Sequence, residues 1–274
     1  MKMAKKQKVN NQPDLFNSIS EEEKKVNSEW HKINNPVKID KPVSFSAIFQ
    51  PTTLFSLKES NSTNSGAKSV LLPSAYAIKM ALLNQVISLE GLKLIEDSKK
   101  VNGKFGNVSK YFKFIRELEI DFHISNENAF VVNNSFVKIL KPSRSSVGFQ
   151  RTVSFREYVY IKGNLEIIFT AKNEEQSNFL KRYIYKINYF GKRGCFFQFI
   201  EYKSESSEPN VKTFDSKGLS AGILQPYDNF DESVTFEQVN NYSTSATKRK
   251  QEIKVIPVSL AGTSKGFSIY RKTN

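Results

Sequence analysis

The segment from Asn173 to Tyr202 constrains the fold of this chain more than any other. Its first part spaces apolar residues three and four positions apart, which predicts an amphipathic helix with one buried stripe. Asn173, followed three residues later by Gln176, is the pattern of a helix N-terminus. The aromatic and apolar run that begins at Cys195 predicts a central strand. A helix, a short turn and a strand must therefore follow one another directly. The buried stripe comprises Phe179, Leu180, Tyr183, Ile184 and Ile187.

The turn in this segment is Gly191-Lys192-Arg193-Gly194, in which two glycines flank two cations. Gly191 falls where a helix C-terminus favours a left-handed residue. Glycine also lets backbone N–H groups approach a phosphate closely, and the two side chains supply positive charge. We interpret the turn as a phosphate-binding loop. We also predict that Lys186, on the polar side of the helix, binds RNA. The alternative is an ordinary helix cap with solvated cations. The Gly-Lys-Ser/Thr order of a nucleotide-hydrolysing loop is missing, which disfavours that activity.

The composition favours a polyanionic partner. The 274 residues include 41 Lys and Arg against 27 Asp and Glu, which gives a formal net charge of +14. Such an excess is typical of proteins that bind RNA, DNA or an acidic membrane surface. The alternative is a chain that is merely rich in lysine. Aromatic residues make up 12% of the chain, too many for a disordered protein, so we expect a folded core.

A second basic segment runs from Lys138 to Arg156 and contains no acidic residue. We expect a cationic loop between two strands, with Phe149 and Phe155 available for stacking on bases. Cations mixed with aromatic faces are typical of sites for RNA and single strands. A solvated surface loop is the alternative. The cations are Lys138, Lys141, Arg144, Arg151 and Arg156.

The chain offers little for catalysis or metal binding. Its two histidines are His31, in a polar N-terminal region, and His123, which alternates with apolar residues on an expected strand. A lone histidine on a strand is more often structural than catalytic. The carboxylates show no metal-ligand spacing, and one cysteine cannot build a cysteine zinc site. We therefore expect no catalytic residue, no metal and no cofactor.

The sequence predicts a soluble, cytoplasmic protein that has no membrane partner. The basic first residues are not followed by the apolar region of a signal peptide. The longest apolar run, Leu71–Leu89, is interrupted by Pro73, Lys79 and Asn84, so it does not predict a membrane span. The single Cys195 cannot form an internal disulfide, which suits a reducing compartment.

The order of the expected elements indicates an α+β chain with a ferredoxin-like core. A strand, a helix that Ser74 caps, further strands, a second long helix and a final strand give the order βαββαβ. We expect a flexible or partly helical arm over residues 1–38, the core over 39–205 and a β-rich extension over 206–274. The expected helices begin at 74, 111 and 173; the expected strands cover 43–57, 119–124, 129–140, 152–170 with a turn at 162–164, 195–202, 234–239, 253–260 and 266–271, and 218–226 is expected to be a loop.

This core, the glycine-rich loop after its second helix and the long basic insertion together resemble the RAMP superfamily of CRISPR-associated proteins. Within that superfamily, the chain is most similar to the Cas-five family, the single-copy subunit at the foot of the Cascade surveillance complex. The segments that carry the resemblance are Phe45–Leu57, Leu71–Leu89, Asn133–Tyr160 and Tyr183–Gln198.

The resemblance implies an RNA-binding subunit of a type I CRISPR effector complex, which caps the 5′ handle of CRISPR RNA for antiviral defence or guided transposition. Residues 138–156 would be its β-hairpin thumb, and residues 191–194 its glycine-rich loop. The implied partners are CRISPR RNA, the backbone and large subunits, and target DNA through the complex. Because no histidine falls clearly at the position that the RNA-cutting minority of the family uses, we expect no enzymatic activity.

Two alternatives stay open. One is a RAMP endoribonuclease that matures precursor CRISPR RNA, with His123 or a Tyr/Lys pair as its catalyst. The other is an RRM-like nucleic-acid-binding protein of a mobile element, although the aromatic signature of an RRM is absent.

Overall fold

The computed structural model describes residues 41–60, 62, 66–96, 107–143, 145–203, 205–218, 221–240, 243 and 248–273. The predicted N-terminal arm over residues 1–38 lies outside these ranges. The described residues belong to one compact unit. It is α+β, with mostly antiparallel sheets and few helices, which confirms the predicted class. Among the described residues, no helix is long and apolar enough to cross a membrane.

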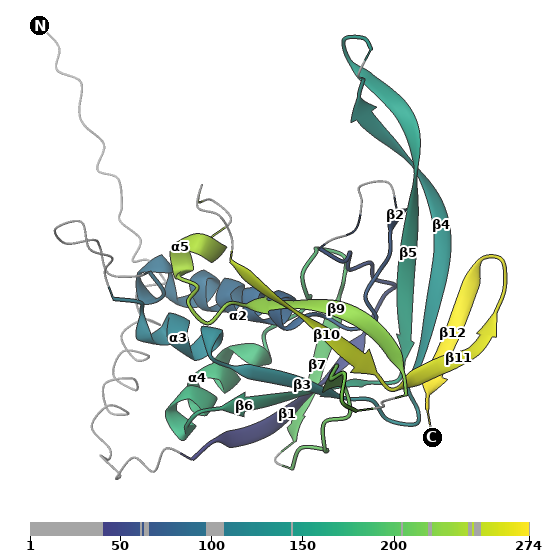
Figure 1. Ribbon diagram of the computed structural model, residues 1–274. Coiled ribbons are helices and arrows are strands. Elements are labelled where there is room, and N and C mark those ends of the chain that lie inside the picture. The colour runs from purple at the N-terminus through teal and green to yellow at the C-terminus, as the bar shows by residue number, and fades with distance from the viewer. Residues whose placement is uncertain are drawn as a thin grey trace, which may run out of the picture. The chain divides into compact units, whose positions relative to one another are not determined.

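A four-stranded antiparallel sheet lies at the centre of this unit, with its strands in the order β3-β6-β1-β7. Strand β1 runs between two neighbours, and it buries consecutive side chains from Phe45 to Phe49. Such a run is expected for a strand that is covered on both faces. Figure 1 shows three helices packed together beside this sheet. The elements are β1 (Val43–Pro51), β3 (Glu119–His123), β6 (Leu165–Ala171), β7 (Phe197–Lys203), α2 (Ala75–Glu90), α3 (Lys110–Arg116) and α4 (Glu174–Ile184).

The predicted helix starts are confirmed at atomic detail. The side chain of Ser74 accepts a hydrogen bond from the backbone N–H of Ala77 at 3.1 Å and so caps helix α2. The Oδ1 atom of Asn173 accepts from the N–H of Gln176 at 2.9 Å and caps helix α4. Helix α2 is apolar on several sides and buries most of them. Gly91, with a φ of 82°, ends it before a short 3₁₀ turn at Leu92–Leu94.

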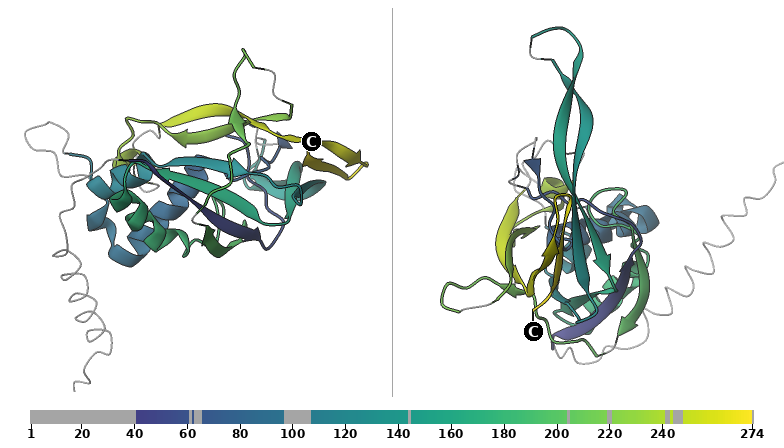
Figure 2. Two further views of the ribbon diagram at one scale, coloured as in Figure 1. Left: turned by 90° about the horizontal axis from the view of Figure 1, so that it is seen from below. Right: turned by 90° about the vertical axis from the view of Figure 1, so that its right-hand side faces the viewer.

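Two strands of 14 residues each, β4 (Ala129–Pro142) and β5 (Phe149–Lys162), form a long hairpin. Figure 1 and the right-hand view of Figure 2 show it projecting from the rest of the unit. Phe130, Val132, Val159 and Ile161 at its root are buried in the core. The hairpin belongs to a five-stranded sheet in the order β11-β12-β4-β5-β2, in which β2 is Gly66–Ala67, β11 is Val258–Thr263 and β12 is Phe267–Lys272.

The C-terminal part of the unit is rich in β-strands, and its elements differ from those expected. A third sheet has the order β8-β10-β9, with β8 at Lys212–Thr213, β9 at Ile223–Phe230 and β10 at Arg249–Ile256. Residues 223–226 of the expected loop at 218–226 therefore belong to strand β9. The expected strand at 234–239 is instead the short helix α5 (Phe236–Val239), because Thr235 and Gln238 form a reciprocal capping box.

Two expectations for the segment from residue 173 to residue 202 are also wrong. Strand β7 lies at the edge of its sheet rather than in the centre. Helix α4 ends at Ile184, so Gly191 does not cap it, although Gly191 does adopt a left-handed φ of 69°. The segment from Tyr185 to Phe190 separates the helix from the glycine loop, and Phe190 and Ile187 fill the core there.

Lys79 is a buried cation of helix α2, with only 3% of its surface exposed. Its Nζ atom donates to the carbonyl oxygen of Arg116 at 2.7 Å and lies 5.6 Å from the centroid of the Phe230 ring. Burial lowers the pKa of Lys79 from 10.5 to about 7, although the carboxylates of Glu252 and Glu119 act to raise it. The folded protein therefore holds a lysine that loses its proton near neutral pH.

We expect this lysine to make stability rise with pH between about 7 and 10. The unfolded chain keeps the Lys79 proton up to the ordinary pKa of lysine, whereas the folded chain has lost it. Lys79→Met removes the titrating group. The free energy of unfolding of the wild type, relative to this variant, should therefore increase by up to about 1.4 kcal/mol per pH unit. Urea denaturation at several pH values measures both proteins, and parallel pH profiles would contradict the lowered pKa.

Candidate nucleic-acid interface

One face of the projecting hairpin combines apolar side chains with cations. In the register of β4 and β5, Phe136 lies opposite Phe155, Lys138 opposite Val153, Leu140 opposite Arg151, and Pro142 opposite Phe149. Directly opposed residues of an antiparallel pair share a face, and every second residue of a strand returns to it. These eight residues therefore form one continuous surface, which we call the hairpin face.

The hairpin face is open to solvent. Phe136, Phe149 and Leu140 are 74%, 72% and 67% exposed. The Phe136 ring meets Phe155 edge-on, with 5.7 Å between the ring centroids. Large apolar side chains this exposed are typical of an interaction surface. Lys138 and Arg151 thus lie not on the expected loop but on the strands themselves.

The remaining predicted cations of this segment lie elsewhere. Lys141 and Arg156 alternate with the hairpin face and so belong to its opposite side. Arg156 lies nearer the root. Its Nη1 atom donates to the carbonyl oxygen of the neighbouring Phe155 at 2.9 Å. Arg144 lies outside the described residues.

The glycine loop forms a tight turn next to the core. The N–H of Cys195 donates to the carbonyl oxygen of Lys192 at 3.1 Å, and the N–H of Phe190 donates to the carbonyl oxygen of Cys195 at 3.2 Å. Gly194 has a φ of 96°, like Gly191 in the region that L side chains rarely adopt. At Gly191, an added Cβ would also lie 2.9 Å from Cδ2 of Leu57. Both glycines are therefore required by the backbone, and the turn leaves the two cations exposed.

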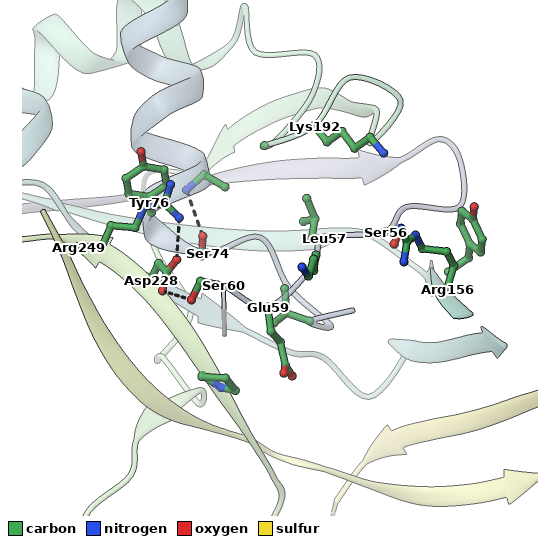
Figure 3. Close-up of a pocket in the computed structure, with 16 residues that line it drawn as sticks. Ser56, Leu57, Glu59, Ser60, Ser74, Tyr76, Arg156, Lys192, Asp228 and Arg249 are labelled. Carbon is green, nitrogen blue, oxygen red and sulfur yellow. Dashed lines mark hydrogen bonds and ion pairs between the residues drawn. The ribbon is translucent and has the colours of Figure 1, made fainter. Parts of the chain in front are cut away.

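Arg156 and Lys192 come together in a cavity of about 440 Å³, which we call the polar hollow (Figure 3). Its volume is in the range of about 300–1,000 Å³ that is usual for ligand sites. Strand β5, the glycine loop, the start of α2 and the strands β9 and β10 all contribute to its wall. Besides the two cations, its polar wall residues are Ser56, Lys58, Glu59, Ser60, Ser74, Tyr76, Tyr158, Asp228 and Arg249.

The end of the polar hollow away from Lys192 and Arg156 holds residues that the sequence did not indicate (Figure 3). Arg249 donates from Nη1 to Oδ2 of Asp228 at 3.2 Å, and its Cζ lies 4.2 Å from the centroid of the Tyr76 ring. Ser60 donates to Oδ1 of Asp228 at 3.0 Å. No local motif marks these four residues, because they come from separate segments: Asp228 lies on β9, Arg249 on β10, Tyr76 on α2, and Ser60 lies between β1 and β2.

A second cavity, of about 750 Å³, adjoins the polar hollow and shares Tyr76, Ala77, Gly191 and Arg249 with it. We call it the apolar groove, because helices α2 and α5 line it mainly with hydrophobic side chains. Its apolar residues include Met80, Ala81, Leu83, Ile87, Leu92, Phe236 and Val239. Lys186 reaches neither cavity. It is exposed beyond the end of α4, at another depression beside Phe196 and Phe199.

The predicted cations of the interface have no acidic partner among the described residues, whereas Arg249 and other cations do. Lys203 pairs with Glu166, and Arg116 and Lys172 both pair with Glu117. Lys250 and Lys254 likewise pair with Glu252. The ion pairs between described residues include none that involves Lys138, Lys141, Arg151, Arg156, Lys192 or Arg193. Their positive charge is therefore available to a ligand.

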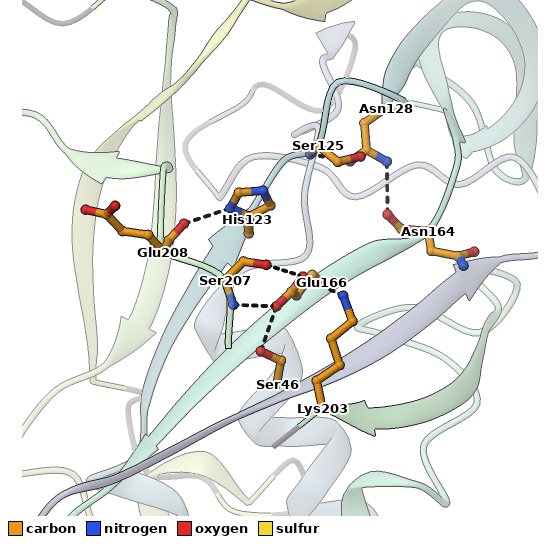
Figure 4. A network of polar contacts seen from close by, with 9 residues as sticks. All are labelled: Ser46, His123, Ser125, Asn128, Asn164, Glu166, Lys203, Ser207 and Glu208. Carbon is orange, nitrogen blue, oxygen red and sulfur yellow. Dashed lines mark hydrogen bonds and ion pairs between the residues drawn. The ribbon is translucent and has the colours of Figure 1, made fainter. Parts of the chain in front are cut away.

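His123 belongs to a structural network instead (Figure 4). Its Nδ1 atom lies 2.7 Å from the carbonyl oxygen of Glu208, on the segment that follows β7. The same segment is held by Glu166, which accepts from the backbone N–H of Ser207 at 3.0 Å and from Oγ of Ser46 at 2.7 Å. Burial raises the pKa of Glu166, but these hydrogen bonds outweigh it and lower that pKa overall. Among the described residues, no group of His, Cys, Asp and Glu could hold a metal ion.

Comparisons with known proteins give a distant structural likeness. No protein-family model matches the chain, and no curated protein matches it. Among solved structures, it is similar to a CRISPR protein from Archaeoglobus fulgidus, with a TM-score of 0.36 and 10% sequence identity. The alignment covers 84% of this chain and 92% of that one.

We expect Lys192 to contact a phosphate inside the polar hollow. Lys192→Ala should then reduce the slope of log affinity against log salt by about 0.7 for a single-stranded RNA. Arg193→Ala is the matched control, because Arg193 is the next residue of the same loop, is exposed and does not line the hollow. Fluorescence anisotropy with a labelled oligonucleotide across a salt series measures the slope. An equal or larger effect of Arg193→Ala would place the phosphate at the tip of the loop instead.

Proposed function

We propose that this chain is a non-enzymatic RNA-binding subunit of a type I CRISPR effector (Cascade) complex, and that it binds and caps the 5′ handle of CRISPR RNA. One observation carries the proposal: cations without acidic partners line both the exposed, partly aromatic hairpin face and the polar hollow at the hairpin root. The hairpin would be the thumb of a RAMP protein, and the Gly191–Gly194 turn would be its glycine-rich loop.

The order of the elements supports this assignment. The sequence β1-α2-β3-β6-α4-β7, together with the strand order β3-β6-β1-β7, is consistent with a ferredoxin-like core. The hairpin is inserted between β3 and β6, where the basic insertion of a RAMP protein is expected. The strands β8 to β12 would form the C-terminal extension.

The chemistry of the interface favours a single-stranded nucleic acid. Phosphates need cations that are not already neutralised, which Lys192 and Arg156 provide in the hollow and Lys138 and Arg151 provide on the hairpin. Unpaired bases need flat apolar surfaces, which Phe136 and other aromatic side chains of the hairpin face provide. A folded duplex would hide its bases and leave these rings without partners. The two kinds of group alternate along one surface, as a strand with exposed bases requires.

The same geometry favours binding without cleavage. His123 is occupied by a backbone carbonyl and does not line the polar hollow. Burial raises the pKa of Tyr183, Tyr202 and Tyr227, so these hydroxyls are poor bases at neutral pH. In this proposal the partners are CRISPR RNA, the backbone and large subunits of the complex and, through the complex, target DNA. The complex would act in the cytoplasm.

The purified chain should bind RNA that contains the handle and leave it intact. Replacing Phe136 and Phe149 together by Ala should weaken the binding by about fivefold or more, because each stacked base is worth about 1–3 kcal/mol. The stability should hardly change, since both rings are more than 70% exposed. Leu224→Ala, an exposed apolar residue on β9, is the control. Anisotropy and gel analysis of labelled RNA measure binding and cleavage.

Other outcomes would support the alternatives. Specific metal-independent cleavage that His123→Ala abolishes would identify an endoribonuclease. Equal affinity for handle RNA and for unrelated single strands would favour an RRM-like protein of a mobile element. Unchanged affinity in the double Phe variant would remove the hairpin face from the interface.

A further inference from the structure

Arg249 lies where the polar hollow meets the apolar groove, and it lines both. Its side chain is 42% exposed, whereas the carboxylate that pairs with it, Asp228, is only 13% exposed. The guanidinium group lies over the Tyr76 ring, with 4.2 Å between Cζ and the ring centroid. Part of the guanidinium surface is therefore left for a ligand, on a side chain that is already held in place.

The contacts around Arg249 fix its orientation. Asp228 is held by Ser60 and by the pairing of β9 with β10, in which Asp228 lies opposite Gln251. Tyr76 lies in the first turn of helix α2, and its ring packs edge-on against Phe230 with 5.2 Å between the centroids. A guanidinium group that is fixed in this way loses little conformational entropy when a ligand stacks on it.

The charge of Arg249 differs from that of the other interface cations. Its ion pair with Asp228 compensates its charge, whereas Lys192 and Arg156 at the other end of the hollow have no such partner among the described residues. A compensated guanidinium group is a weaker phosphate ligand, but its flat surface still stacks on a base. Proteins that bind RNA use arginine planes in this way.

We propose that Arg249, held by Asp228 and supported by Tyr76, is the platform on which one unpaired base of the bound RNA stacks. The phosphates of the same strand lie toward Lys192 and Arg156, and the base extends from the polar hollow into the apolar groove. This inference rests on the proposed binding of single-stranded RNA. It assigns the site to a nucleobase of the strand and not to its backbone.

Two oligonucleotides of equal length and charge separate the contribution of the bases to binding from that of the backbone. One is an eight-nucleotide adenine RNA, and the other is the same ribose-phosphate strand without bases. The wild type should bind the adenine strand at least about fivefold more tightly, the effect of one stacked base. Arg249→Lys keeps the charge but removes the plane, so it should lower this preference by about fivefold, the effect of one stacked base, and leave the affinity for the abasic strand unchanged. Lys250→Ala, the neighbouring cation, which pairs with Glu252, is the matched control and should keep the preference.

Tyr76→Leu provides a second variant in case Arg249→Lys unfolds, which circular dichroism would detect. Removing the supporting ring should reduce the preference in the same direction. A preference that is undiminished in both variants, or an equal loss of affinity for both strands, would overturn the platform and leave RNA binding intact. Binding of neither strand by the wild type would overturn the proposed function together with this inference. Loss of the preference in Lys250→Ala would show a general effect of charge and would also contradict the platform.

Discussion

The register between β4 and β5 is the constraint on which the interface depends. The pairing runs without a break from Ala129 opposite Lys162 to Pro142 opposite Phe149. A shift of one residue would turn every side chain of the hairpin face to the other side. The root sets the register, because the backbone N–H and C=O groups of Val159 each bond to Phe55, at 2.7 and 2.9 Å, while its side chain is fully buried. The position of Arg156 in the polar hollow follows from this anchor three residues away.

Sequence patterns predicted the parts of the fold that local chemistry determines. The caps at Ser74 and Asn173 and the turn at residues 162–164 are set by hydrogen bonds and backbone angles within a few residues. The extent of the hairpin was underestimated. Serine, proline and lysine around its tip indicated a loop, yet cross-strand pairing holds strand geometry as far as Pro142 and Phe149. The helix α5 was missed because its apolar residues also fit a strand, and only the capping box of Thr235 distinguishes the two.

The candidate site likewise has one part that the sequence predicts and another that it does not. The glycine loop and the basic hairpin could be predicted, because each is a contiguous run of residues with an unusual composition. The sequence could not predict that Arg156 and Lys192 line one cavity, because this depends on how the core places β5 and the turn before β7. Tyr76, Asp228 and Arg249 come from three separate elements, and nothing in the composition around them suggests a site.

The distribution of compensated charge explains how one interface could both attract a strand and orient it. At physiological ionic strength, electrostatic attraction between exposed charges fades beyond about 8 Å. Cations on a projecting hairpin, such as Lys138 and Arg151, extend the reach of that attraction, and no acidic group among the described residues cancels it. Arg249 adds little to this reach because Asp228 neutralises it. Its contribution is the orientation of a flat group at short range. Attraction should therefore fall with salt, whereas the preference for a base at Arg249 should persist.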